Sequence, residues 1–173
     1  TALAVLPAYH RVIFDEAHNI EDSATEYFGL NVTRNGAMTL LGRLYRIDRG
    51  RERGHLPYIE VKLAQTGAGR TQSEFDTIHD LIHNDALPAV AATREALETA
   101  FQALRSLVAE RCGAVGRDIN WRLTPEVLQD RDLREIHEVY VMPAVDEARR
   151  CAKVTNTLRG LLRDIEPGPR DTE

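Results

Sequence analysis

The sequence predicts a mainly α fold, an antiparallel helical bundle with a small β ribbon and a short N-terminal strand. Its 173 residues suit one domain, and 43% hydrophobic with 28% charged residues is the balance of a globular chain with a real core. Apolar residues recur at spacings of three and four along residues 75–108 and 141–165. This spacing indicates helices that each bury one face.

Near the N-terminus, residues 11–14 form a short apolar run that ends in two acidic residues, which predicts a buried strand. Asn19 can cap a following helix over residues 20–28, and Gly29 can end it. A further helix is expected over residues 37–47, where apolar side chains share one face.

The middle of the chain should hold a basic loop, a β ribbon and a long helical stretch. Residues 49–54, with two glycines and charged neighbours, predict a flexible surface loop. Residues 59–63 and 119–123 both alternate apolar and polar side chains, so they are the expected strands of the ribbon. Thr71–Glu74 resembles a capping box that opens a helix, and Pro88 either divides the following apolar stripe into tandem helices or kinks one helix.

The C-terminal part predicts two more helices. Thr124 and Pro125 suit the cap and first turn of a helix that leads to Pro143. The apolar stripe from Val141 to Ile165 then indicates a long helix packed against other helices.

Composition excludes several classes of protein. No run approaches the roughly 18 apolar residues of a membrane span, and no basic flank precedes the short apolar stretch in residues 1–7. We therefore expect a cytoplasmic protein without membrane contact. Cys112 and Cys151 are too few for a disulfide scaffold and lack the spacing of a zinc or iron-sulfur site, so we expect two buried thiols.

The net charge of −5 is unevenly distributed, because residues 34–70 carry +5 while residues 1–33 and 71–100 carry −4 and −5. The basic segment contains a candidate DNA-binding cluster: Arg43, Arg46, Arg49, Arg51 and Arg53. With Tyr45 and His55 between them, these arginines can grip a phosphate backbone while a ring stacks on a base. The alternative is an ordinary solvated basic loop.

A weaker signal is the pair His79 and His83, four residues apart on a predicted helix with Asp76 and Asp80 nearby. Such a pair can form one side of a divalent metal site. Ligands from another element would be required, and ordinary surface histidines are the alternative.

Residues 12–18, Val-Ile-Phe-Asp-Glu-Ala-His, carry the strongest chemical signal. A strand that delivers Asp15 and Glu16 at its carboxyl end can place one carboxylate on a water of Mg²⁺ and the next beside the water that attacks a nucleoside triphosphate. This is the Walker B arrangement, in the Asp-Glu-Ala-His (DEAH) form used by one class of helicase motors.

Residues 6–29 resemble the motif II region of DinG helicases, which belong to the XPD-like group of superfamily 2 DNA helicases. The resemblance implies that Asp15 holds Mg²⁺ through water, that Glu16 polarises the attacking water and that His18 couples the nucleotide site to DNA contacts. It assigns residues 1–29 to the first motor domain, with the strand detached from its parent sheet. Residues 30–166 would be an Arch-like helical insertion that helps to enclose single-stranded DNA, and residues 167–173 a tail.

The sequence also lacks several motifs of that family. The sequence has no G-x-x-x-x-G-K-[ST] phosphate loop, no four-cysteine set for the family's iron-sulfur cluster and no later motor motifs. Phosphoryl transfer needs the phosphate loop and the later motor motifs assembled around one metal. We therefore expect this fragment alone to hydrolyse nothing and to bind no cofactor, whereas Mg²⁺, ATP, the cluster and the remaining motor domains belong to the intact parent, an ATP-hydrolysing helicase of DNA repair.

Two alternatives remain. The chain could be a helical protein-protein interaction module whose stripe over residues 141–165 binds a partner helix, with the DEAH sequence a coincidence. A small metallohydrolase that uses Asp15, Glu16 and His18 directly is the weaker alternative, because the sequence offers no obvious second cluster.

Overall fold

The computed structural model describes residues 31–65, 72–113 and 121–163, together with the single positions 11, 13 and 29. Contacts within the chain divide it into Thr1–Val32 and Thr33–Glu173, and every described helix and strand belongs to the second unit. The predicted strand over residues 11–14, the helix over residues 20–28 and the DEAH box lie outside the described residues, apart from isolated positions.

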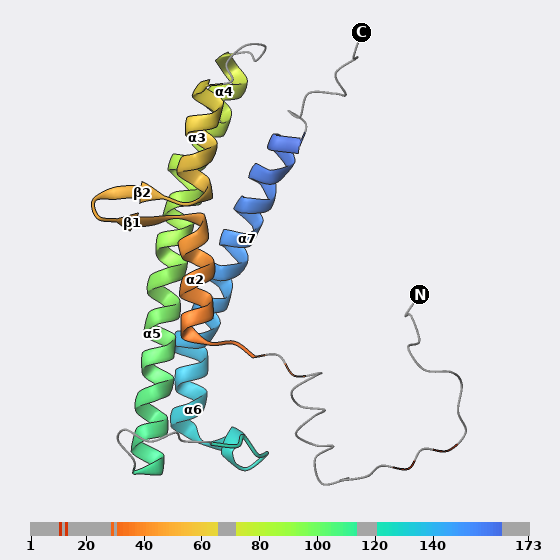
Figure 1. Ribbon diagram of the computed structural model, residues 1–173. Helices are drawn as coiled ribbons and strands as arrows, with labels where there is room; N and C mark the ends of the chain where they lie inside the picture. The colour runs from red at the N-terminus through yellow and green to blue at the C-terminus, as the bar shows by residue number, and fades with distance from the viewer. Residues whose placement is uncertain are drawn as a thin grey trace. The chain divides into compact units, whose positions relative to one another are not determined.

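Two long helical rods run antiparallel in the second unit (Figure 1). The first rod consists of α4 (Gln72–Asp80), the π-helical segment η2 (Leu81–Ala86) and α5 (Leu87–Cys112). After a 3₁₀ turn, η3 (Val127–Gln129), the second rod consists of α6 (Arg131–Ile136), the π-helical segment η4 (His137–Val141) and α7 (Met142–Arg163). Because α5 and α7 pack along each other, the predicted mainly α, antiparallel architecture is confirmed.

Each rod returns from π to α winding one residue before a proline. The amide of Leu87, which precedes Pro88, donates to the carbonyl of Ile82, five residues back, and the amide of Met142 makes the same type of bond before Pro143. Proline has no N–H, and its ring clashes with the carbonyl four residues earlier in an α-helix, so the wider π turn accommodates it. The expected interruption at Pro88 is therefore a π segment within one continuous rod.

Two shorter helices and a β-hairpin precede the first rod. They are α2 (Arg34–Leu44), β1 (Arg46–Asp48), β2 (Arg51–Arg53) and α3 (His55–Gln65). Thr33 caps α2, because its hydroxyl accepts a hydrogen bond from the amide of Gly36 at 3.0 Å. The helix expected over residues 37–47 thus begins and ends three residues earlier, since Tyr45 is already extended and leads into β1.

The predicted position of the β ribbon was wrong. Residues 59–63 lie in α3, where Leu56, Ile59 and Leu63 share one helical face at spacings of three and four. Residues 121–123 have no regular secondary structure, and residues 119 and 120 lie outside the described part. The observed ribbon is β1 with β2, in the segment predicted to be a flexible loop.

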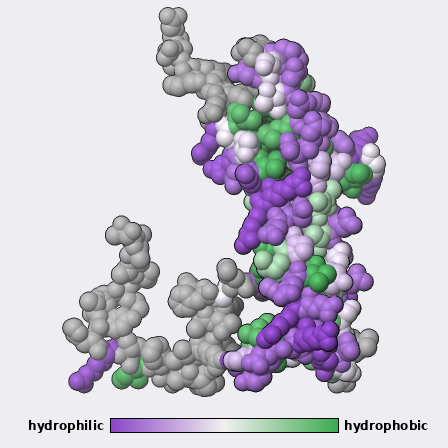
Figure 2. All heavy atoms as spheres, turned by 180° about the vertical axis from the view of Figure 1, so that it is seen from behind, coloured by the Kyte–Doolittle hydropathy of each residue, from purple (hydrophilic) through white to green (hydrophobic). Residues whose placement is uncertain are grey.

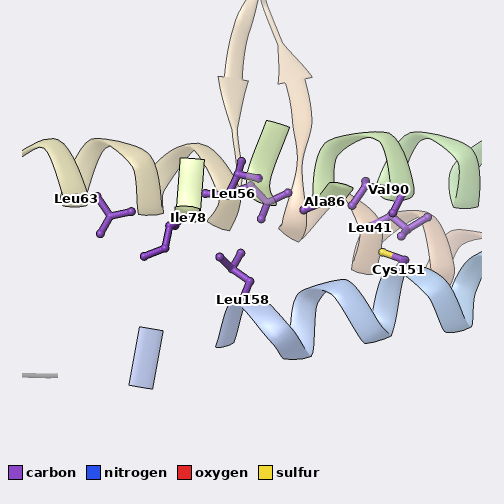
Figure 3. Packing of buried hydrophobic residues seen from close by; sticks show 10 residues of the cluster. Leu41, Leu56, Leu63, Ile78, Ala86, Val90, Cys151 and Leu158 are labelled. Atoms are coloured by element: carbon purple, nitrogen blue, oxygen red, sulfur yellow. The ribbon is translucent and has the colours of Figure 1, made fainter. Parts of the chain in front are cut away.

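One hydrophobic cluster joins α2, α3, the first rod and α7. Figure 3 shows Leu63 and Ile78 on the side that faces Leu158 of α7. The buried members of the cluster are Leu41, Leu56, Leu63, Ile78, Ile82, Ala86, Ala89, Val90, Cys151 and Leu158. The predicted stripe of the last helix therefore packs against the chain's own core.

The prediction of two buried thiols was correct for Cys151 and wrong for Cys112, which is exposed at the C-terminal end of α5.

Most of the face seen in Figure 2 is hydrophilic, with smaller hydrophobic patches. Among the described helices, none combines the length and apolar character that crossing a bilayer requires.

Candidate nucleic-acid interface

The arginine cluster forms a β-hairpin with two chemically different faces. In the antiparallel register, Arg46 pairs with Arg53, Ile47 with Glu52, and Asp48 with Arg51. Opposed residues point to the same face of a ribbon, and successive residues alternate. Three arginines and Asp48 thus share one face, which we call the arginine face, while Ile47 and Glu52 occupy the other.

A two-residue turn places a fourth arginine at the tip of the hairpin. Arg49 and Gly50 have φ values of 51° and 74°, and two positive values in succession are the signature of a type I′ turn. This turn matches the twist of the flanking strands, so it sets the register that creates the arginine face.

The hairpin is joined closely to the end of α2 at Gly54. This residue has a φ of 127°, and a Cβ atom there would lie 2.4 Å from the carbonyl oxygen of Leu44. Only glycine allows such an approach of two backbones. The exit of β2 is therefore held against the helix that precedes β1.

Two hydrogen bonds anchor the base of the hairpin around Tyr45. Arg94 of α5 donates from Nη2 to the carbonyl oxygen of Tyr45 at 2.8 Å, and the Tyr45 hydroxyl donates to Oε1 of Glu52 at 2.9 Å. The bond to Glu52, followed by burial and the negative charge of Glu52, raises the pKa of Tyr45. Because its ring also packs against the core, Tyr45 attaches the hairpin to the bundle and does not stand free to stack on a base.

The positive charge of the hairpin is only partly neutralised. Residues 43–53 contain five arginines against Asp48 and Glu52, a net charge of +3. Nε of Arg53 lies 3.2 Å from Oδ2 of Asp48, but both side chains are about half exposed, so this pair is weak. Within the described part of the chain, Arg43, Arg49 and Arg51 have no carboxylate partner.

A groove of about 640 Å³ lies at the base of the hairpin, between α2 and α5. Its polar rim includes Arg34 and Glu98, which pair through Nε at 3.0 Å to each carboxylate oxygen. The hydrogen bond with Glu98 and its negative charge raise the pKa of Arg34. The charges of Arg34 and Glu98 offset each other, whereas Arg46, which also lines the groove, belongs to the arginine face.

The structure brings four predicted site residues, Arg46, Arg49, Arg51 and Arg53, into one hairpin, and Arg43 is exposed nearby on α2. Asp15, Glu16 and His18 lie outside the described residues, so the predicted Mg²⁺ ligand and catalytic groups remain predictions. Sequence reasoning missed Arg94, because its hydrogen-bond partner is 49 positions away in the chain.

Comparison of this chain with protein-family models, curated proteins and solved structures found no match.

Proposed function

We propose that this chain is part of an ATP-dependent DNA helicase of the DinG and XPD-like kind, comprising the DEAH box and an Arch-like helical insertion whose hairpin contacts single-stranded DNA. The observation that carries the proposal is the exposed arginine face, with Arg49 at the adjoining tip. The sequence of residues 6–29 supplies the link to a helicase motor.

The arginine face suits a flexible phosphate backbone. Side chains directly opposite on a ribbon are roughly 5 Å apart at Cβ, and diagonal neighbours are roughly 7 to 8 Å apart, so long guanidinium groups can reach different phosphates. Planar guanidinium groups bind phosphate oxygens through two hydrogen bonds at once. Such contacts are independent of base sequence, which a translocating helicase requires.

The motor chemistry would depend on residues of the DEAH box. Asp15 would hold Mg²⁺ through water, Glu16 would polarise the attacking water and His18 would transmit the nucleotide state toward the DNA contacts. ATP hydrolysis would also need a phosphate loop and an arginine finger, which motor domains outside this sequence would supply. The predicted iron-sulfur cluster would likewise use cysteines outside it.

The interaction-module alternative has less support. In α7, Leu158 of the predicted stripe and the neighbouring Cys151 are buried in the chain's own core, and Val154 and Leu161 pack against that core. A partner helix would have to displace these contacts before it could bind the same face. The hairpin arginines are exposed and none of them belongs to the buried core, although Arg53 pairs with Asp48 and Arg46 donates to the carbonyl oxygen of Gly42.

The proposal is tested in the intact helicase chain that contains this segment. Replacement of Arg46, Arg49, Arg51 and Arg53 by Gln should weaken binding of single-stranded DNA and lower DNA-stimulated ATP hydrolysis and unwinding. Hydrolysis measured without DNA should remain. The matched control replaces four exposed arginines on other elements: Arg105, Arg131, Arg149 and Arg159.

Two results would contradict the proposal separately. Unchanged DNA affinity and unwinding in the hairpin variant would show that the hairpin is not the DNA-binding surface. Normal ATP hydrolysis after Glu16→Gln would remove the assignment to a helicase motor.

A further inference from the structure

Three side chains, one from α3 and two from the first rod, lie close together outside the arginine face. Oε1 of Glu60, on α3, lies 3.1 Å from Nδ1 of His79 on α4 and 2.6 Å from Nε2 of His83 in η2. The three ligand atoms all lie within 4.8 Å of one another. We propose that Glu60, His79 and His83 form a binding site for a divalent transition metal, with Zn²⁺ as the best match.

The local structure explains why the two imidazoles meet. His79 and His83 are four residues apart, which places them one above the other on the same side of a helical rod. Their ring centroids are 4.3 Å apart, and the ring of Phe75 stacks on His79 with an interplanar angle of 9°. Phe75 itself packs against the core, so it supports the first ring of the pair.

The third ligand comes from a helix that the core holds in place. Glu60 lies on the side of α3 that also carries Leu56 and Leu63, and both leucines are buried in the cluster that includes Ile78 and Ile82. Figure 3 shows Leu56, Leu63 and Ile78 in this packing. Because the core sets the distance between α3 and the first rod, the carboxylate of Glu60 is positioned by the fold and not by local sequence.

The donor set selects the class of metal. Imidazole nitrogens suit Zn²⁺, Ni²⁺ and Cu²⁺, whereas Mg²⁺ and Ca²⁺ prefer sites built from oxygen ligands. Two histidines and one carboxylate are three of the four ligands of a tetrahedral zinc site. Water can supply the fourth, because the side chains of His79 and His83 are 50% and 43% exposed.

The distances are compatible with an ion after a small adjustment. Donor atoms around tetrahedral Zn²⁺ lie about 3.3 Å apart, because Zn–N and Zn–O bonds are about 2.0 to 2.1 Å long. The separations of Glu60 from His79 and His83, 3.1 and 2.6 Å, are shorter than this by about 0.2 and 0.7 Å. Outward movement of the partly exposed Glu60 and His83 side chains by about 0.7 Å would bring this pair to the tetrahedral spacing.

Asp76 and Asp80, the acidic neighbours seen in the sequence, are not part of this group. Oδ1 of Asp76 instead accepts a hydrogen bond from Nε2 of Gln72 at 2.9 Å.

A bound ion would link α3 to the first rod through Glu60 and would stabilise this part of the bundle. This inference is independent of the proposed helicase function.

The test is titration of the chelator-treated chain with zinc chloride, followed by calorimetry and thermal unfolding. We expect one ion per chain and a rise in Tm of roughly 5 to 10 °C at free zinc about one hundred times Kd. The variant His79→Asn with His83→Asn should lose both the binding heat and the rise in Tm, and Glu60→Gln should weaken binding. Circular dichroism of the metal-free variants verifies that they fold.

The matched control replaces two other exposed histidines, His55 and His137, by Asn and should bind zinc like the original chain. Absence of any binding heat and of any rise in Tm would overturn the proposal, since the three groups would then form hydrogen bonds alone. Undiminished binding by the His79 and His83 double variant would also overturn it, because the ion would then lie elsewhere.

Discussion

The hydroxyl of Thr93 on α5 lies 3.0 Å from the backbone carbonyl oxygen of Glu147 on α7 and so links the two antiparallel helices. The same hydroxyl lies 2.7 Å from the carbonyl oxygen of Ala89 in its own helix, so its proton is shared between two acceptors. Thr93 is 2% exposed. A hydrogen bond between rods at a buried position fixes their relative register more strictly than apolar contact does, because hydrogen bonds are directional.

Thr93→Val should therefore lower the free energy of unfolding by about 1 to 2 kcal/mol, since the shape is kept but the buried polar contact between helices is lost. Urea denaturation measures the change. The control is Thr99→Val on the same helix, because the exposed hydroxyl of Thr99 donates to the carbonyl oxygen of Glu95 within its own helix and, among the described residues, not to α7. Equal effects of the two substitutions would show that the link to α7 contributes nothing.

Gly54→Ala should lower the free energy of unfolding by about 2 kcal/mol or more, because it combines an unfavourable φ with a collision between Cβ and the carbonyl oxygen of Leu44. Gly160→Ala is the control. Gly160 is helical with open space around it, so alanine there should raise stability by roughly 0.5 to 1 kcal/mol. A neutral result at Gly54 would mean that the hairpin does not depend on this close approach.

Asp130 should make the stability of the chain depend on acid pH. Its Oδ1 accepts hydrogen bonds from the amides of Leu133 at 3.0 Å and Asp132 at 2.9 Å, and Nη2 of Arg111 lies 3.0 Å from its Oδ2. The bond from Leu133, followed by the bond and charge of Arg111, holds the pKa of Asp130 below its ordinary value. The stabilisation is therefore present above the ordinary aspartate pKa of about 3.9 and is lost as the pH falls through the lower, folded-state pKa.

Asp130→Asn, which keeps a capping oxygen but removes the charge, should lower Tm at neutral pH, and the difference should shrink in acid. Thermal unfolding followed at several pH values measures this. Asp146→Asn is the control, because Asp146 forms an exposed pair with Arg149 and should change Tm little at any pH. A difference in Tm between Asp130→Asn and the original chain that stays constant down to low pH would contradict a stabilising role of the Asp130 charge.

The sequence was informative where one physical effect dominates. The apolar stripes of the long helices predicted the two rods, because burial of one face requires that spacing. Of the stripe predicted from Val141 to Ile165, Leu158 is buried in the core and Leu162 packs against it, as expected. In α3, the same residues satisfied two patterns at once: Ile59, Val61 and Leu63 alternate, yet Leu56, Ile59 and Leu63 also fit a helix. The helical pattern prevails because Leu56 and Leu63 are buried in the core on one side of α3, and Ile59 packs against that core.

The hairpin and the three-residue cluster needed information that the sequence does not carry locally. Strands β1 and β2 are too polar to show apolar alternation, and the usable signal was a glycine at the second position of a two-residue turn, Arg49-Gly50. His79 and His83 could be recognised from their spacing. Glu60 could not, because 19 and 23 positions separate it from them and only packing brings it close.

The central claim is that the hairpin arginines bind the phosphates of single-stranded DNA, and salt-dependent fluorescence polarisation of a labelled single strand tests it most directly. Each neutralised phosphate of a single strand contributes about −0.7 to the slope of log K against log salt. The variant with Arg46, Arg49, Arg51 and Arg53 replaced by Gln should therefore bind more weakly and with a slope flatter by about 2 to 3. The control with Arg105, Arg131, Arg149 and Arg159 replaced should keep the original slope. Identical affinity and slope for the original chain and the hairpin variant would contradict the claim.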